Sequence, residues 1–78
     1  MLDLVQLLSD LARAIVDQPE EVSVSEETDG DTVLLTLHVA ESDMGKIIGR
    51  HGKIAKSIRM VMKAAANSAG RKVSVEIR

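Results

Sequence analysis

Hydrophobic residues recur along the chain with two periods, one typical of helices and one typical of strands. Leucine and isoleucine return at steps of four, three and four residues within residues 1–16, which places them on one face of an amphipathic helix. These residues are Leu4, Leu8, Leu11 and Ile15. The helix is expected to end before Pro19, because the residue that precedes a proline disfavours helical geometry. The first predicted element is therefore a helix over residues 1–16.

Alternating apolar and polar residues predict three strands further along the chain. The alternation is short over Val22–Ser25, clearest over Val33–Val39 and clear again over Val73–Ile77. Asp29-Gly30 lies between the first two and favours a tight turn, since glycine reaches positive φ without steric cost. The first two strands are therefore expected to pair as a hairpin.

Two further helices are predicted between the second and third strands. Ser42 can accept a hydrogen bond from a free backbone N–H group, so we expect it to cap a short helix over residues 43–48. A longer helix is predicted from Lys53 to about Ala69, and Gly70 can end it in a left-handed conformation. In that helix, Ile54, Ile58, Val61, Met62 and Ala65 are expected to face the core, and Lys53, Lys56, Arg59 and Lys63 to face solvent.

The order of these elements is αββααβ, which places the chain in the α+β class. Each strand needs one covered face, so the economical arrangement is a three-stranded sheet with all three helices on one side. The opposite face is expected to carry Ser23, Ser25, Leu34, Thr36, His38, Ser74 and Glu76. A length of 78 residues fits one domain, which we expect to span residues 1–78.

Charge is divided unevenly between the two halves of the chain, although the net charge is only −2. Residues 1–43 carry eleven acidic side chains and one basic one, whereas residues 44–78 carry nine basic side chains and one acidic one. A local basic surface attracts phosphate even where the net charge is near zero. Mixed charges also serve simply to solvate a surface, so this pattern needs a motif beside it before it indicates a ligand.

Such a motif lies between the two predicted helices, where two glycines flank two polar residues in Gly49-Arg50-His51-Gly52. Without Cβ atoms, the glycines permit turn conformations closed to other residues and let a sugar-phosphate backbone approach closely. The longer helix begins here, and its free N–H groups and positive dipole end suit an anion. Arg50, His51 and Lys53 lie where they can contact phosphate groups.

The segment IIGRHG followed by KIAKSI resembles the signature of the KH domain, in which a GXXG loop between two helices binds about four nucleotides. The αββααβ order resembles the type II arrangement of this domain. The length, the leading helix and the ending RKVSVEIR are similar to the small bacterial KhpA family, and the resemblance covers nearly the whole chain. It implies contacts to single-stranded RNA by Gly45, Lys46, Ile48, Gly49, Arg50, His51, Gly52, Lys53 and Lys56.

The same resemblance implies a biological role. The family is associated with RNA chaperone activity or post-transcriptional regulation, with cell shape and cell-wall organisation, and with homodimers or complexes with a larger KhpB-like RNA-binding partner. An alternative hypothesis is a protein-interaction module that uses the fold mainly for homo- or heterodimerisation. Leu34 and Met60 are expected to be exposed and fit that alternative, although two scattered apolar residues are normal for any surface.

Three other kinds of nucleotide-binding site fit the sequence less well. A helix-hairpin-helix DNA-binding motif has a glycine loop one residue shorter and lacks the β-hairpin. A P-loop needs glycine at Ile47 and a hydroxyl group at Ile54. The chain contains no Phe, Tyr or Trp, so it cannot stack bases on aromatic rings as RRM and many OB-type proteins do.

Residue types also argue against catalysis, a metal site, a cofactor and a membrane location. The two histidines, His38 and His51, have no further ligand at a spacing that suits a metal, and cysteine and tyrosine are absent. A chain without cysteine favours the reducing cytoplasm. No apolar run approaches the ~20 residues of a membrane span, and acidic Asp3 and Asp10 do not fit a signal peptide.

Overall fold

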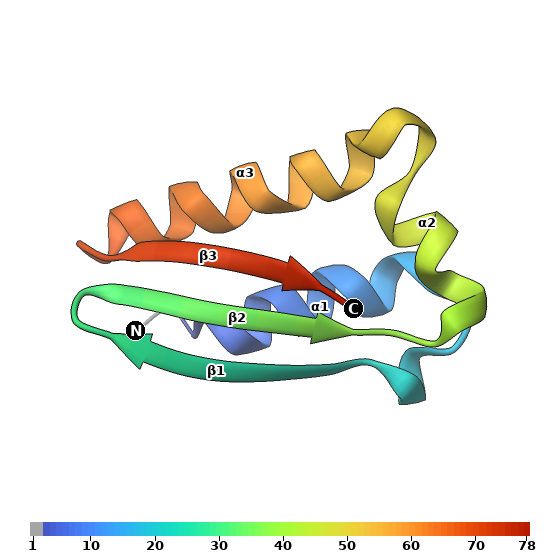
Figure 1. Cartoon of the computed structure of the whole chain (residues 1–78), viewed down its shortest axis with the longest axis horizontal. Coiled ribbons are helices and arrows are strands. Elements are labelled where there is room, and N and C mark those ends of the chain that lie inside the picture. Colours follow the sequence, from blue (N-terminus) through green and yellow to red (C-terminus); the bar gives the residue numbers. More distant parts are fainter. Residues whose placement is uncertain (1–2) are drawn as a thin grey trace.

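The computed structural model describes residues 3–78 and arranges them as a helix, two strands, two helices and a strand (Figure 1). The elements are α1 (Leu4–Ile15), β1 (Ser23–Asp29), β2 (Thr32–His38), α2 (Met44–Ile48), α3 (Lys53–Ser68) and β3 (Lys72–Ile77), with 3-10 turns η1 (Pro19–Glu21), η2 (Glu41–Asp43) and η3 (Arg50–Gly52). This order confirms the predicted α+β class and the αββααβ sequence of elements. Met1 and Leu2, which the predicted first helix included, lie outside the described residues.

The sheet has the strand order β1-β2-β3, with one antiparallel and one parallel pair. β1 and β2 form the predicted hairpin, and Gly30 takes a positive φ of 65° in its turn. β2 and β3 are parallel, and parallel neighbours require a crossover connection rather than a tight turn. That crossover consists of α2, the glycine loop and α3, so the loop lies at one end of the molecule, beyond the sheet (Figure 1).

The hydrophobic core lies between the sheet and the helices. α1 contacts β1, β2 and α3, while α3 lies along β3, so one face of the sheet is covered (Figure 1). Side chains from every layer are buried there, among them Leu4, Leu8 and Ala12 of α1, Val33, Leu35 and Leu37 of β2, Ile47 of α2, and Ile58, Met62 and Ala66 of α3. The intervening residues of β2 point to the uncovered face, which confirms three helices on one side of the sheet.

The C-terminus of α3 forms a Schellman motif around Gly70, as the sequence predicts. Gly70 has a φ of 72° and donates its N–H to Asn67 O at 3.0 Å. The N–H of Arg71 donates to Ala66 O at 2.8 Å. These two bonds satisfy carbonyls that would otherwise lack a partner at the helix end.

The buried face of α3 differs from the prediction. Its buried residues are Ala55, Ile58, Met62 and Ala66, whereas Ile54 and Val61 are 37% and 45% exposed. The buried positions repeat at steps of three, four and four, so they form a single helical stripe. Its two alanines let α3 approach its neighbours closely, and Ile54 and Val61 then lie on the flank. The prediction that Ile54 and Val61 face the core was therefore wrong, and two alanines take their place.

Candidate nucleic-acid interface

The loop between α2 and α3 has an unusual backbone, with positive φ at three of its four residues. Gly49 has φ 73° and ψ 177°, His51 has φ 57° and ψ 25°, and Gly52 has φ 73° and ψ 13°. Most residues avoid positive φ, and the extended conformation of Gly49 is essentially confined to glycine. The backbone conformation therefore requires glycine at position 49 and favours glycine at position 52.

The two glycines differ in their surroundings. A Cβ atom at Gly49 would lie 2.6 Å from Cγ1 of Ile54, well inside van der Waals contact. A Cβ atom at Gly52 would meet nothing within 4 Å. Gly49 thus lets the chain pack closely against the start of α3, whereas Gly52 is needed only for its backbone conformation.

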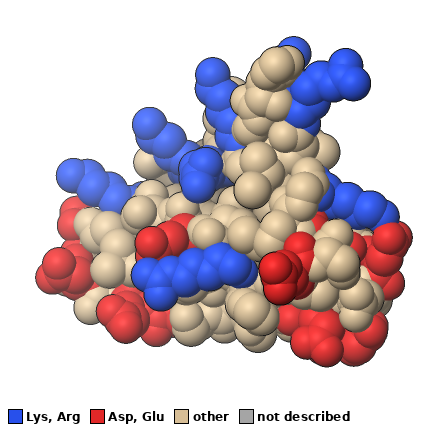
Figure 2. Space-filling view, turned by 45° about the vertical axis from the view of Figure 1, so that its right-hand side comes forward, with Lys and Arg blue, Asp and Glu red and all other residues tan. Residues whose placement is uncertain are grey.

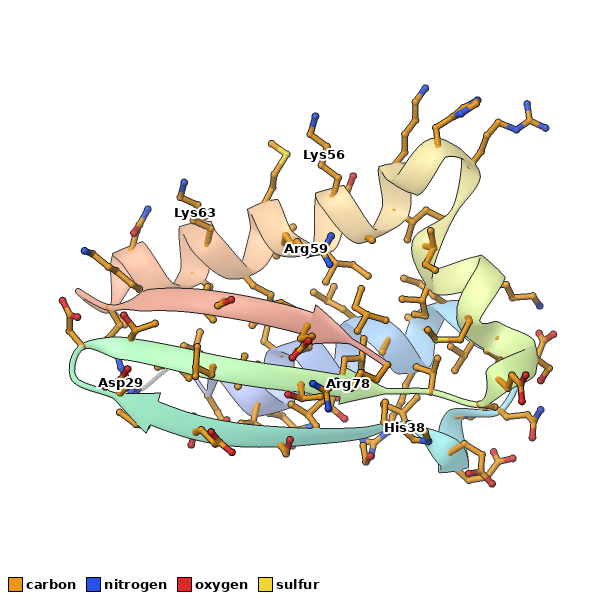
Figure 3. All side chains as sticks on the ribbon, viewed as in Figure 1. Asp29, His38, Lys56, Arg59, Lys63 and Arg78 are labelled. Atoms are coloured by element: carbon orange, nitrogen blue, oxygen red, sulfur yellow. The ribbon has the colours of Figure 1, made fainter. Side chains whose placement is uncertain are left out.

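Basic side chains surround this loop and continue along the outer face of α3. Arg50, His51, Lys53, Lys56 and Lys63 are all exposed. In Figure 3, Lys56 and Lys63 point away from the sheet. In Figure 2, most Lys and Arg side chains project from the upper part of the molecule, where α3 and the loop lie, whereas Asp and Glu gather along the lower part, with one basic side chain among them. The charge asymmetry of the sequence therefore becomes a basic surface in the fold.

The N-terminus of α3 adds backbone groups to this surface. Lys53 donates its N–H to Arg50 O within the loop. Among the described residues, no side chain caps the N-terminus of α3. The first turn of a long helix carries free N–H groups and a partial positive charge, both of which favour an anion. Side chains and backbone thus point to the same kind of ligand.

Arg59 is exposed, as predicted, but unlike the other basic residues of this face it also bonds to the sheet. Its Nε donates to the carbonyl oxygen of Val75 in β3 at 3.3 Å. Every second residue of β3 bonds to β2, as the N–H groups of Lys72 and Arg78 do to Asp31 O and Leu37 O. Val75 belongs to the alternate set, so its carbonyl faces the free edge of the sheet. Arg59 therefore connects α3 to β3 (Figure 3).

The predicted residues of α2 fall into three different settings. Ile48 is 41% exposed beside the loop, and Gly45 is exposed with open space where a Cβ would be. Lys46 is exposed too, but its Nζ forms an ion pair with the carboxylate of Asp17, which follows α1. The fold thus brings the predicted residues of α2, the loop and the start of α3 to one end of the molecule.

Asp43 is a residue whose importance the sequence did not reveal. Its side chain is only 1% exposed, and its two carboxylate oxygens accept the backbone N–H groups of Asp17 and Gln18, each at 3.1 Å. These bonds satisfy a buried charge and connect the end of α1 to the start of α2. The predicted cap, Ser42, instead accepts a hydrogen bond from Gln18 Nε2 at 2.9 Å, and no side chain among the described residues caps α2.

Metal-binding clusters and membrane-spanning helices are both absent from the described residues. Residues 3–78 contain no cluster of three or more His, Cys, Asp or Glu side chains that could hold a metal ion. Within the same residues, no helix has the length and apolar character needed to cross a membrane.

Known proteins resemble this chain over almost its full length. Residues 5–77 match the family described as KhpA/KhpB, KH domain. RNA-binding protein KhpA of Clostridium acetobutylicum is 53% identical over 72 residues, which cover 92% of this chain and 96% of that protein. RNA-binding protein KhpA of Clostridium perfringens is 47% identical over the same shares of the two chains.

A solved structure resembles the fold with little sequence similarity. It is the crystal structure of Era in complex with MgGDPNP and nucleotides 1506–1542 of 16S ribosomal RNA, with a TM-score of 0.67 and 17% identity. The match covers 95% of this chain but only 28% of that one, so it bears on the fold alone. The family is shown instead by the match over residues 5–77 and by the two KhpA relatives. The chain belongs to the KhpA/KhpB KH-domain family.

Proposed function

We propose that this protein binds single-stranded RNA, with the sugar-phosphate backbone held at the loop Gly49–Gly52. The observation that carries the proposal is the loop itself, because its strained backbone brings an uncapped helix N-terminus and exposed basic side chains together. The contact residues in this proposal are Gly45, Lys46, Ile48, Gly49, Arg50, His51, Gly52, Lys53 and Lys56. The names of the KhpA relatives, which are RNA-binding proteins, support the proposed ligand.

In this proposal the chain acts as one KH domain over residues 1–78 and as a binding protein rather than an enzyme. A cytoplasmic location is a prediction from the absence of cysteine, whereas an RNA chaperone or regulatory role and a link to cell shape and cell-wall organisation are predictions from the family resemblance. None of them affects the physical question of how the loop holds RNA. The lysines of α3 lie at different distances from the loop, and this difference makes the proposal testable.

Alanine at Lys53 or Lys56 should weaken RNA binding and reduce its salt dependence, whereas alanine at Lys63 should do little. Lys53 and Lys56 lie in the first turn of α3, next to the loop. Lys63 lies seven residues beyond Lys56, about 10 Å along the helix, which is close to one Debye length at 0.1 M salt. Each lost phosphate contact should lower the slope of log affinity against log salt by about 0.7.

The measurement is a salt titration of each variant with one short single-stranded RNA. All three lysines are exposed, so the melting temperatures of the variants should stay close to that of the wild type. If Lys63→Ala lost as much slope as Lys53→Ala, the RNA would have to run along α3 instead of ending at the loop.

A second candidate function, protein interaction, is favoured by the exposed apolar side chains of α3. Ile54 and Val61 lie seven residues apart, which is about two helical turns, so they share one flank of the helix. Met60 is 64% exposed but lies about 100° around the helix from Val61, so it is not part of this strip. Such a strip suits a contact with a second copy of the chain or with a larger KhpB-like partner. It is compatible with RNA binding, because the loop stays free.

If this strip is a homodimer contact, Val61→Asp should convert a dimer to a monomer without unfolding the protein. Val61 is 45% exposed, so a buried charge would arise only in the dimer. Sedimentation equilibrium gives the mass, and Leu34→Asp is the control, because Leu34 is similarly exposed at 38% on the uncovered face of the sheet. A monomeric wild type would exclude the homodimer contact, and a dimer broken only by Leu34→Asp would move the interface to the sheet.

A further inference from the structure

Lys46 differs from the other basic residues of the proposed RNA site because its charge is already paired. Its Nζ contacts Oδ2 of Asp17, and the two side chains are 48% and 74% exposed, respectively. Across residues 3–78, Arg50, Lys53 and Lys56 have no such carboxylate partner. Of the basic residues proposed to contact RNA, Lys46 is thus the one that an acidic side chain already holds in the free protein.

Backbone hydrogen bonds keep Asp17 at this position. Asp17 and Gln18 follow α1 and donate their N–H groups to the buried carboxylate of Asp43, at the start of α2. The side chain of Gln18 also donates to Ser42 Oγ. These three bonds hold the segment after α1 against the start of α2. The carboxylate of Asp17 therefore remains close to Lys46, which lies three residues after Asp43 and three residues before the loop.

This arrangement opposes RNA binding in two ways. A phosphate group that contacts Lys46 must displace the carboxylate of Asp17 from it. The displaced carboxylate then stays near the phosphate and repels it, since both are negative. Exposed ion pairs are weak and are screened by salt, so phosphate can displace the carboxylate, but with a lower affinity than a free lysine would give.

We propose that Asp17 is a built-in competitor of RNA phosphate. Its carboxylate pairs with Lys46 in the free protein, and an RNA phosphate replaces it when RNA binds. The inference rests on the proposed RNA-binding function and adds a residue, on a different element from the loop, that limits affinity. A site limited in this way releases RNA more readily, which suits a protein that exchanges between RNAs.

Asp17→Asn tests the inference, because it removes the charge while keeping the shape of the side chain and the N–H donated to Asp43. Binding to one short single-stranded RNA should become about two- to fivefold tighter, the range expected for a weak exposed ion pair. The gain in affinity should shrink as the salt concentration rises, because salt screens the Asp17–Lys46 pair of the wild type. Glu20→Gln is the matched control: Glu20 lies three residues away, is exposed and forms no ion pair among residues 3–78. It should change affinity less.

A double-mutant cycle separates a direct effect through Lys46 from general repulsion of RNA. In a Lys46→Ala background, Asp17→Asn should raise RNA affinity much less than it does in the wild type, because only the direct repulsion between the Asp17 carboxylate and phosphate is then left to relieve. Equal gains in RNA affinity for Asp17→Asn and Glu20→Gln would overturn the inference, as would a gain from Asp17→Asn that is as large without Lys46 as with it. If the wild type bound no RNA at all, the proposed function itself would fail. Wild-type binding without an effect of Asp17→Asn would contradict the competitor role alone.

Discussion

Replacing both Arg50 and His51 with aspartate should lower the affinity for short single-stranded RNA by at least about 100-fold, or roughly 2.7 kcal/mol. The two side chains are the exposed tip of the loop, and the change sets two negative charges against phosphate in place of one positive and one neutral group. Hydrogen bonds to charged groups contribute about 1.5–3 kcal/mol each, so losing even one accounts for most of this effect. The measurement is equilibrium binding at fixed salt.

The fold should survive this double substitution. Both side chains are exposed, and His51 has the left-handed conformation that aspartate, like histidine, accepts more readily than most residues. The melting temperature should therefore stay within a few degrees of the wild type. Asn67→Asp/Lys72→Asp is the control, because it changes the net charge by the same amount at the far end of α3. If the loop variant kept its affinity, or if the control lost as much, phosphate contact at the loop would be wrong.

The elements were predictable because each has a local signature in the sequence. Strict alternation over Val33–Val39 identifies β2, and Gly70 marks the end of α3, where the Schellman motif is found. The hairpin follows from Asp29-Gly30. The order of the elements then leaves few arrangements, since a sheet must bury one face. The position of the loop within a crossover follows from the parallel pairing of β2 and β3.

The contacts that were missed depend on residues far apart in the sequence. Nothing near Asp43 indicates that its carboxylate is buried against Asp17 and Gln18, which lie 26 and 25 residues earlier. For the same reason, the pairing of Lys46 with Asp17 was not predicted. Arg59 is exposed, as its helical spacing predicts, but its bond to β3 was not predicted. Local patterns predict which face a residue lies on, whereas its partners depend on packing.

The basic surface and the acidic remainder of the molecule explain how a chain with a net charge of −2 can hold an anion. Attraction between charges at 0.1 M salt extends only about 10 Å, so a phosphate at the loop interacts mainly with the nearest lysines and arginines. The acidic side chains on the other side of the molecule, visible in Figure 2, are largely screened from it. Asp17 is the exception that the structure identifies, since it lies beside one of those lysines.

Alanine at Gly49 should destabilise the protein far more than alanine at either neighbouring glycine of the site. The combination of φ 73° and ψ 177° is nearly closed to residues with a Cβ atom, and that atom would lie 2.6 Å from Ile54. Backbone strain of about 1–3 kcal/mol and overpacking of a similar size together predict a loss of about 3–5 kcal/mol in the free energy of unfolding. Small domains are only marginally stable, so part of the protein should be unfolded at 37 °C.

Gly52 and Gly45 provide graded controls on the two sides of Gly49. Gly52→Ala meets no neighbouring atom but keeps a φ of 73°, so it should cost about 1–2 kcal/mol. Gly45 lies in α2 with open space around its Cα, so Gly45→Ala should raise stability by up to about 1 kcal/mol. Thermal unfolding of the three variants measures the order, at about 4–8 °C per kcal/mol for a domain of this size. If Gly49→Ala and Gly52→Ala lowered the free energy of unfolding equally, Ile54 would have to move aside at little cost. Close packing against α3 would then not determine the conformation of the loop.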